Sequence, residues 1–153
     1  MAIIREAVLE DLPILKTFEQ EIIQFERPFA SNIKKNPVTY YDLKELILQK
    51  DTHVLVAIID EEIIGSGYAQ IQNSKPYFKP EQFAYLGFMF VSPQHRGKGI
   101  NGEITKKLIE WAKRRGILEI QLDVYATNKS ATNAYKKIGF QPDLLKMRLQ
   151  NEG

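Results

Sequence analysis

The chain of 153 residues is long enough for one domain, and its 44% hydrophobic and 26% charged residues are typical of globular proteins. This composition excludes intrinsic disorder, a collagen repeat and a coiled-coil rod. Because the chain has no cysteine and only two histidines, His53 and His95, we expect no disulfide, no cysteine nucleophile and no metal centre. The longest apolar run, residues 54–59, is too short to cross a membrane, and the first residues lack the apolar stretch of a signal peptide. We therefore expect a soluble, cytoplasmic protein with one domain over residues 1–153.

Charge is distributed unevenly along the chain, although the net charge is only +2. Residues 1–30 carry six acidic and three basic side chains, a net charge of −3. Residues 94–115 carry seven arginines or lysines and two glutamates, a net charge of +5. A basic segment of this kind is either a solvated helix face or a site for an anion, so the local sequence must decide between them.

Local patterns predict ten elements of secondary structure. Apolar residues recur at helical spacing after Asp11, a common helix-capping residue, and again after Gly99. Stretches rich in β-branched and aromatic residues predict strands, and the acidic residues 60–62 join two of them in a hairpin. In chain order we expect strands and helices at residues 3–7 (strand), 12–25 (helix), 41–48 (helix), 53–59 (strand), 63–71 (strand), 83–91 (strand), 99–115 (helix), 118–125 (strand), 131–138 (helix) and 144–149 (strand). The order β-α-α-β-β-β-α-β-α-β indicates an α/β fold, with a mixed sheet and helices on both faces.

The segment between the strand ending at Val91 and the helix beginning at Gly99 has the features of an anion site. The start of a helix offers unpaired backbone N–H groups and the positive end of the helix dipole, which together bind phosphate well. Gly97 and Gly99 let a ligand approach the backbone closely, and Arg96 and Lys98 add positive charge. These four residues also fit an ordinary surface turn, so the residues around them are needed to decide.

Residues 91–101, Val-Ser-Pro-Gln-His-Arg-Gly-Lys-Gly-Ile-Asn, resemble the acetyl-CoA signature of the GNAT N-acetyltransferase superfamily. In that register Arg96 is the first position and Gly99 the first glycine, while Asn101 stands where a small residue is usual. A second block, over residues 122–140, resembles the ribosomal-protein alanine N-acetyltransferases. The resemblance implies a GNAT-like, mostly antiparallel sheet and transfer of an acetyl group from acetyl-CoA to a primary amine.

The resemblance also implies which residues bind the cofactor. The strand backbone is expected to pair with the pantetheine arm of acetyl-CoA, and the backbone amides of residues 96–101 are expected to hold its pyrophosphate. Asn128 matches a cofactor-contacting asparagine of the family, although an asparagine before a helix is also a common cap. The expected cofactor-binding residues are Met89, Phe90, Val91, Arg96, Gly97, Lys98, Gly99, Ile100, Asn101 and Asn128.

Two residues are expected to act in catalysis. Tyr135 matches the tyrosine that protonates the departing thiolate as a general acid, and family members transfer the acetyl group directly, without an acyl-enzyme. Because the amine must lose a proton, a base is also required. Asp123 stands where the ribosomal-protein alanine N-acetyltransferases carry a glutamate; Glu26, Glu81 or an ordered water are the alternatives.

Two other functions fit parts of the sequence. Residues 97–102 satisfy the Gly-x-Gly-x-x-Gly fingerprint of NAD(P)-binding oxidoreductases, with Asp123 about 20 residues further on. However, five residues separate Val91 from Gly97, where the fingerprint places glycine almost directly after the strand. A noncatalytic CoA-binding module is the second alternative. Nucleic-acid binding is not expected, because Trp111, the sole Phe, Tyr or Trp of residues 94–115, falls on the apolar helix face.

The sequence leaves the amine acceptor open. The acidic N-terminal region would suit a cationic amine or a basic peptide end, and the loops 26–38 and 72–82 are the expected walls of its pocket. A protein N-terminus, a polyamine, an aminoglycoside and a free amino acid all fit these observations. We expect a monomer or a homodimer that binds acetyl-CoA and an amine, with no membrane partner.

Overall fold

The computed structural model describes residues 1–152. The chain divides into two compact units, residues 1–123 and 124–153, and each is described here by itself. The expectation of one domain over residues 1–153 therefore stays a prediction. No helix within residues 1–152 is both long and apolar enough to cross a membrane.

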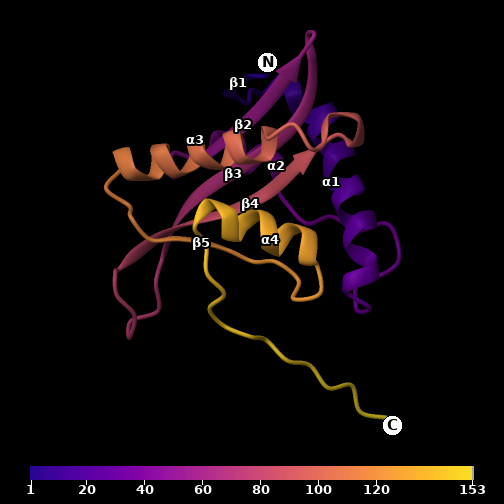
Figure 1. The fold of residues 1–153 in the computed structure, drawn as a ribbon, viewed down its shortest axis with the longest axis vertical. Coiled ribbons are helices and arrows are strands. Elements are labelled where there is room, and N and C mark those ends of the chain that lie inside the picture. The colour runs from indigo at the N-terminus through magenta and orange to yellow at the C-terminus, as the bar shows by residue number, and fades with distance from the viewer. Residues whose placement is uncertain (153) are drawn as a thin grey trace. The chain divides into compact units, whose positions relative to one another are not determined.

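The first unit is built on one sheet of five strands in the order β1-β2-β3-β4-β5 (Figure 1). Its strands and helices are β1 (Ile3–Glu6), α1 (Leu12–Glu26), α2 (Leu43–Leu48), β2 (Thr52–Ile59), β3 (Glu62–Asn73), β4 (Gln82–Val91), α3 (Ile100–Arg114) and β5 (Ile120–Leu122), and the second unit contains α4 (Lys129–Ile138). All neighbouring strands are antiparallel except β4 and β5, which are parallel. This arrangement confirms the predicted α/β fold with a mixed, mostly antiparallel sheet.

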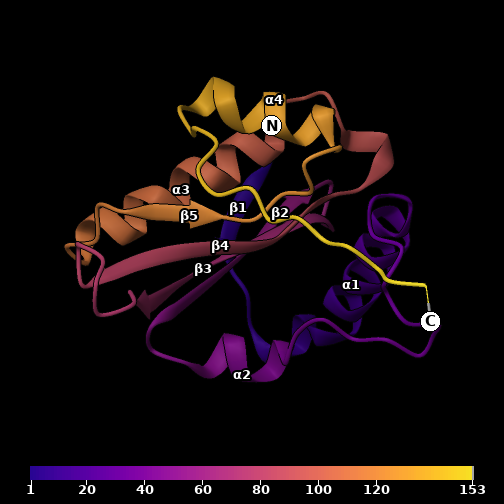
Figure 2. The same ribbon diagram turned by 90° about the horizontal axis from the view of Figure 1, so that it is seen from below.

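Helices cover both faces of this sheet, as Figure 2 shows, with α2 on one side and α3 on the other. On the face of α1 and α2, the rings of Phe18 and Phe90 pack with centroids 4.5 Å apart. On the opposite face, Gly67 of β3 makes room for α3, because a Cβ there would lie 2.9 Å from Ile104 Cγ2 and 2.7 Å from Met89 Sδ. The first turns of α3 are thereby held against the end of β4.

A β-bulge interrupts β4 at Phe88, which has a φ of 57°. The pairing register with β3 shifts here, between Ser66 and Tyr68. A slip of one residue sends the following side chains to the opposite face, so Met89 packs towards α3 and Phe90 towards α1. Residues 83–91 are apolar on both faces, and the slip therefore costs little burial.

Asp11 stands directly before α1, as predicted, but its side chain does not cap that helix. Oδ2 accepts a hydrogen bond from the Val8 N–H at 2.8 Å, and the Arg5 guanidinium donates to both carboxylate oxygens at 2.8 and 3.0 Å. The reason is a short 3-10 turn, Leu9–Asp11, which gives Asp11 helical dihedrals and directs its carboxylate back towards Val8. The hydrogen bonds from Arg5 hold the pKa of Asp11 below its ordinary value.

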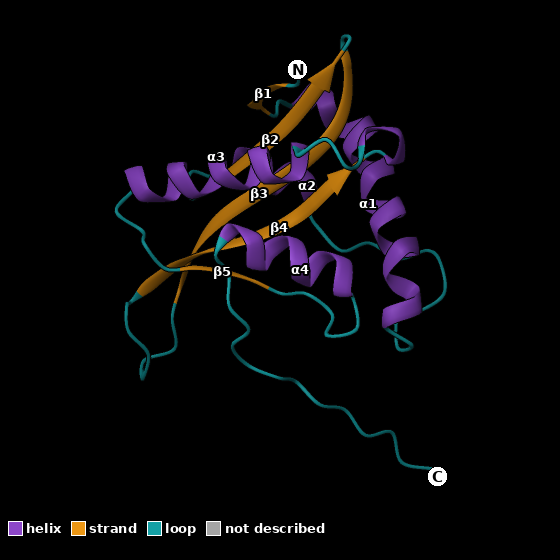
Figure 3. Cartoon of the chain, viewed as in Figure 1, coloured by secondary structure: helices purple, strands orange, loops and turns teal. Residues whose placement is uncertain are grey.

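The last two predicted strands are wrong in extent or existence. The strand expected at 118–125 is reduced to β5, which pairs only with residues 84–86 of β4. The strand expected at 144–149 is absent, and residues 140–152 have no regular secondary structure (Figure 3). Apolar and charged residues alternate there as in a strand, but a strand also needs a hydrogen-bonded neighbour, and none pairs with this segment within residues 1–152.

Candidate functional site

One edge of β4 is free over its second half. The parallel partner β5 pairs with β4 only as far as Leu86 and ends at Leu122. Beyond that point, residues 87–91 pair only with β3 among the strands of residues 1–152. An unpaired strand edge is a template on which an extended ligand can add as a further strand.

The alternation of hydrogen bonds along β4 shows which residues face this edge. The Ser92 N–H donates to the carbonyl of Ile64 on β3 at 2.7 Å. Because strand residues direct their N–H and C=O groups to alternate edges, Phe90 also faces β3, whereas Met89 and Val91 face the free edge. Of the three residues predicted to pair with pantetheine, two therefore offer backbone groups to a ligand.

Arg96, in the loop after β4, contacts both that strand and α1. Its Nε donates to the Val91 carbonyl at 2.9 Å, and its guanidinium carbon lies 5.8 and 6.0 Å from the ring centroids of Phe25 and Phe90. The Arg96 N–H, one of the amides predicted to bind pyrophosphate, donates to the Pro93 carbonyl at 3.4 Å. The Met89 N–H and C=O and the Val91 N–H are left for a ligand.

The amides after Arg96 form a group without protein acceptors. Gly97 and Gly99 both have a φ of 79°, a left-handed conformation that favours glycine, and Gly99 directly precedes α3. A Cβ at either position would meet no atom within 4 Å. Within residues 1–152, no acceptor is found for the N–H groups of Gly97, Lys98, Gly99, Ile100, Asn101 and Gly102. These amides, at the positive end of the α3 dipole, form a site suited to a phosphate group.

Asp123 lies beside the beginning of the free edge. It follows β5 directly, and its Oδ2 accepts a hydrogen bond from the hydroxyl of Tyr85 on β4 at 3.1 Å. Burial, together with the charge of Asp123, raises the pKa of Tyr85, so this hydroxyl keeps its proton and stays a donor. Asp123 is thus oriented by a tyrosine two residues before Gly87, where the free edge begins.

The other two predicted bases lie in different places. Glu26, the last residue of α1, is half-buried, and this burial raises its pKa, while hydrogen bonding from Tyr40 opposes the shift. Its charge also contributes to the raised pKa of Tyr85, as the smallest of the causes. Glu81 precedes β4, and eight residues of strand place it about 26 Å from Met89. Asp123 is hydrogen-bonded to Tyr85 of β4, whereas Glu81 lies at the far end of that strand.

The second unit contains the remaining predicted residues, Asn128 and Tyr135. Asn128 is the N-cap of α4, where its Oδ1 accepts a hydrogen bond from the Ala131 N–H at 3.2 Å. Tyr135 is half-buried within α4, and its ring meets that of Phe140 edge-on with centroids 5.8 Å apart. The capping role of Asn128 is confirmed, and the cofactor and catalytic roles of these two residues stay predictions.

Sequence reasoning missed a group of tyrosines around the bulge. Tyr41 and Tyr68 meet edge-on at 5.8 Å, and Tyr68 lies 6.5 Å from Tyr85. The ring of Tyr68 covers Gly87, where a Cβ would lie 2.6 Å from the ring. These residues come from three distant segments, and the sequence carries no signal for their convergence apart from the aromatic character of residues 83–91.

The glycines of residues 97–102 lie in the wrong context for a dinucleotide fingerprint. They follow a 3-10 turn, Pro93–His95, and a Cβ at Gly102 would meet no atom within 4 Å, whereas the third glycine of the fingerprint allows close packing of helix and strand. The motif does lie between the parallel strands β4 and β5, but the 3-10 turn separates Gly97 from the end of β4, whereas the dinucleotide fingerprint places its first glycine almost directly after the strand.

Known proteins of similar sequence are acetyltransferases. Thialysine N-epsilon-acetyltransferase of Mus musculus is 44% identical over 57 residues, which cover 37% of this chain and 34% of that protein. A candidate ribosomal-protein alanine N-acetyltransferase of Bacillus subtilis is 24% identical over 151 residues, covering 92% of this chain and 82% of that protein. The chain spans about a third of the length of the first of these relatives.

Solved structures share the fold. A mutant of a Bacillus halodurans protein superimposes with a TM-score of 0.89 at 22% identity, covering 98% of this chain and 99% of that one. A predicted acetyltransferase from Clostridium acetobutylicum, solved with acetyl-CoA, gives a TM-score of 0.76 at 22% identity, covering 98% and 96%. The family model described as "Acetyltransferase (GNAT) family" matches residues 18–140, and the chain belongs to that family.

Proposed function

We propose that this protein transfers the acetyl group of acetyl-CoA to a primary amine. The observation that carries the proposal is the position of the unpaired amides of residues 97–102 one short turn after a strand with a free edge. One feature suits the pyrophosphate of CoA and the other suits its extended pantetheine arm, which carries amide groups. Membership of the GNAT family supports the same reading.

In the proposed complex, the Met89 N–H and C=O and the Val91 N–H pair with the amides of pantetheine. The backbone of Gly97 to Gly102 holds the pyrophosphate, and Lys98 adds positive charge beside it. Asn128 contacts the cofactor, as the resemblance to the family implies. Bound in this way, acetyl-CoA supplies a thioester whose carbonyl carbon is open to attack by an amine.

Proton transfers at the two ends of the reaction fall to Asp123 and Tyr135. Asp123 accepts a proton from the acceptor ammonium, directly or through a water, so that the amine nitrogen can attack the thioester carbonyl. A C–N bond forms and the C–S bond breaks, and the nitrogen releases a second proton to solvent as the amide forms, from which the Tyr135 hydroxyl is restored. Tyr135 gives its proton to the departing thiolate of CoA, as the family resemblance implies. Tyr85 positions the Asp123 carboxylate, which supports Asp123 over Glu81 as the base.

The test is release of CoA thiol from acetyl-CoA in the presence of a panel of amines. We expect turnover by the natural chain, and a loss of about a hundredfold in kcat for Tyr135→Phe. The affinity of the variant for CoA, measured by isothermal titration, should be unchanged. Binding of CoA without turnover of any amine would favour a noncatalytic CoA-binding module, and binding of NAD(P)H without CoA would contradict the proposal altogether.

A further inference from the structure

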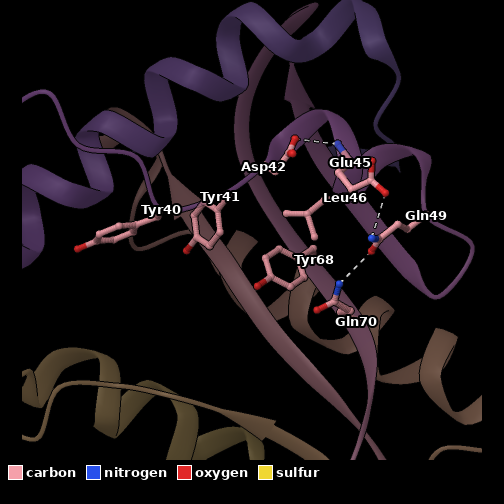
Figure 4. A pocket seen from close by; sticks show the side chains of 8 residues that line it. All are labelled: Tyr40, Tyr41, Asp42, Glu45, Leu46, Gln49, Tyr68 and Gln70. Carbon is pink, nitrogen blue, oxygen red and sulfur yellow. Dashed lines mark hydrogen bonds between the residues drawn. The ribbon is translucent and has the colours of Figure 1, made fainter.

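A groove of about 250 Å³ opens between α2 and β3, on the sheet face of α1 and α2. The phenol rings of Tyr40, Tyr41 and Tyr68 form one part of its wall, as Figure 4 shows. The carboxylates of Asp42 and Glu45 form another part. Two glutamines and a leucine complete the lining, so the described lining includes no lysine, arginine or histidine.

This groove is connected to the bulge of β4 through its tyrosines. The Tyr41 hydroxyl accepts a hydrogen bond from the Phe88 N–H at 3.3 Å, and the Tyr68 ring covers Gly87. Gly87 is the first residue of the free edge at which the thioester arm of acetyl-CoA is proposed to pair. The rings of Tyr41 and Tyr68 therefore line the groove and also contact the part of β4 where the free edge begins.

The lining of the groove suits an organic cation. The faces of phenol rings attract ammonium groups, and two carboxylates add negative charge. Asp42 uses Oδ1 to cap α2, accepting from the Glu45 N–H at 3.2 Å, and Glu45 uses Oε1 to accept from Gln49 at 3.3 Å. Each carboxylate has a second oxygen with no hydrogen bond within residues 1–152 and no ion pair to a lysine or arginine.

We infer that the groove binds a second cationic group of the amine acceptor, so that the preferred acceptors are aliphatic diamines or polyamines. The inference rests on the proposed acetyl transfer and does not change which atoms react. One amine of the acceptor reaches the thioester beside Asp123, and the other remains protonated between the tyrosine rings and the carboxylates of Asp42 and Glu45. Acceptors with a neutral or anionic second group gain nothing from this lining.

The inference is tested by comparing kcat/KM for 1,4-diaminobutane and 1,5-diaminopentane with that for butylamine and pentylamine. A symmetric diamine has two reactive ends, which alone gives a factor of two. We expect a preference of about tenfold or more for the diamines, and a decrease of this preference as salt screens the distal charge. Masking one amine of 1,4-diaminobutane with an acetyl group should abolish the preference, because the length is kept and the charge is lost.

Substitutions test whether the preference for diamines arises in the groove. The double substitution Asp42→Asn/Glu45→Gln keeps the capping geometry, because asparagine is also a good N-cap, and should reduce the diamine preference at least fivefold. The matched control Glu61→Gln/Glu62→Gln removes two exposed carboxylates at the β2–β3 turn and should leave the preference unchanged.

Each result has a distinct meaning. A preference for diamines of no more than twofold in the natural chain would overturn the inference, while acetyl transfer would still stand. A preference that is unchanged by the substitutions at Asp42 and Glu45 would have the same meaning. Better turnover of a peptide N-terminus than of any diamine would also overturn it. Absence of turnover with every amine would instead contradict acetyl transfer itself, and the inference with it.

Discussion

Replacing Gly99 by alanine tests the phosphate site most sharply. Gly99 has a φ of 79°, and an L-residue held in that conformation costs about 1–2 kcal/mol. For a chain of this size, such a loss lowers Tm by about 2–8 °C. Relaxing the strain would also turn the amides of Gly99 and Ile100 away from the bound phosphate. A hydrogen bond to a charged group is worth about 1.5–3 kcal/mol, so losing one weakens CoA binding roughly tenfold to a hundredfold.

The chain offers a matched control at the other end of α3. Gly116 has a φ of 80°, and a Cβ there would also meet no atom within 4 Å. The substitution Gly116→Ala should therefore cost the same stability while leaving CoA binding unchanged. The assays are thermal unfolding and isothermal titration with CoA. Equal CoA affinities for Gly99→Ala and Gly116→Ala, with comparable losses of Tm, would refute the placement of the phosphate.

Three further substitutions test other parts of the structure. Asp11→Ala removes the acceptor of Arg5 and should cost about 2 kcal/mol at pH 7, measured by urea unfolding. Because the folded pKa of Asp11 is depressed, its stabilisation is complete above the unfolded pKa and is lost as the pH falls through the folded one. The difference in free energy of unfolding between the variant and the natural chain should therefore decrease as the pH falls below about 4. A difference that stays constant would count against the ion pair. Gly87→Ala would press a Cβ against the Tyr68 ring at 2.6 Å and should cost about 1–3 kcal/mol, with partial recovery when Tyr68→Leu is added; an undiminished Tm would disprove this packing. Asp123→Asn should lower kcat about a hundredfold or more with unchanged CoA affinity, and a retained kcat would exclude Asp123 as the base.

The sequence was most informative where a pattern depends on neighbouring residues. Apolar spacing predicted α1 and α3 to within a residue or two of their observed ends. The acidic turn between β2 and β3 was found in the same way, and Asp60 and Glu61 have the positive φ values that tight hairpins require. The glycine-bearing loop before α3 was also predicted, because its residue types carry the phosphate-binding property themselves.

Features that depend on pairing between distant segments could not be predicted. The bulge at Phe88 was hidden because residues 83–91 are aromatic or apolar on both faces of the strand, so a slip in register leaves no break in the pattern. The early end of β5 was also hidden. Residues 118–125 alternate like a strand throughout, but only three of them pair with β4. The tyrosine next to Asp123 was missed because Tyr85 lies 38 residues earlier in the chain.

The central claim, that CoA binds along the free edge of β4 and on the loop before α3, is tested most directly by amide hydrogen exchange resolved by residue. On saturation with CoA, the amides of Met89, Val91 and residues 97–102 should gain protection. The Phe90 amide already faces β3 and should change little. Protection of Met89 and the loop without a change at Phe90 would agree with the account, whereas saturating CoA that leaves these amides unprotected would contradict it.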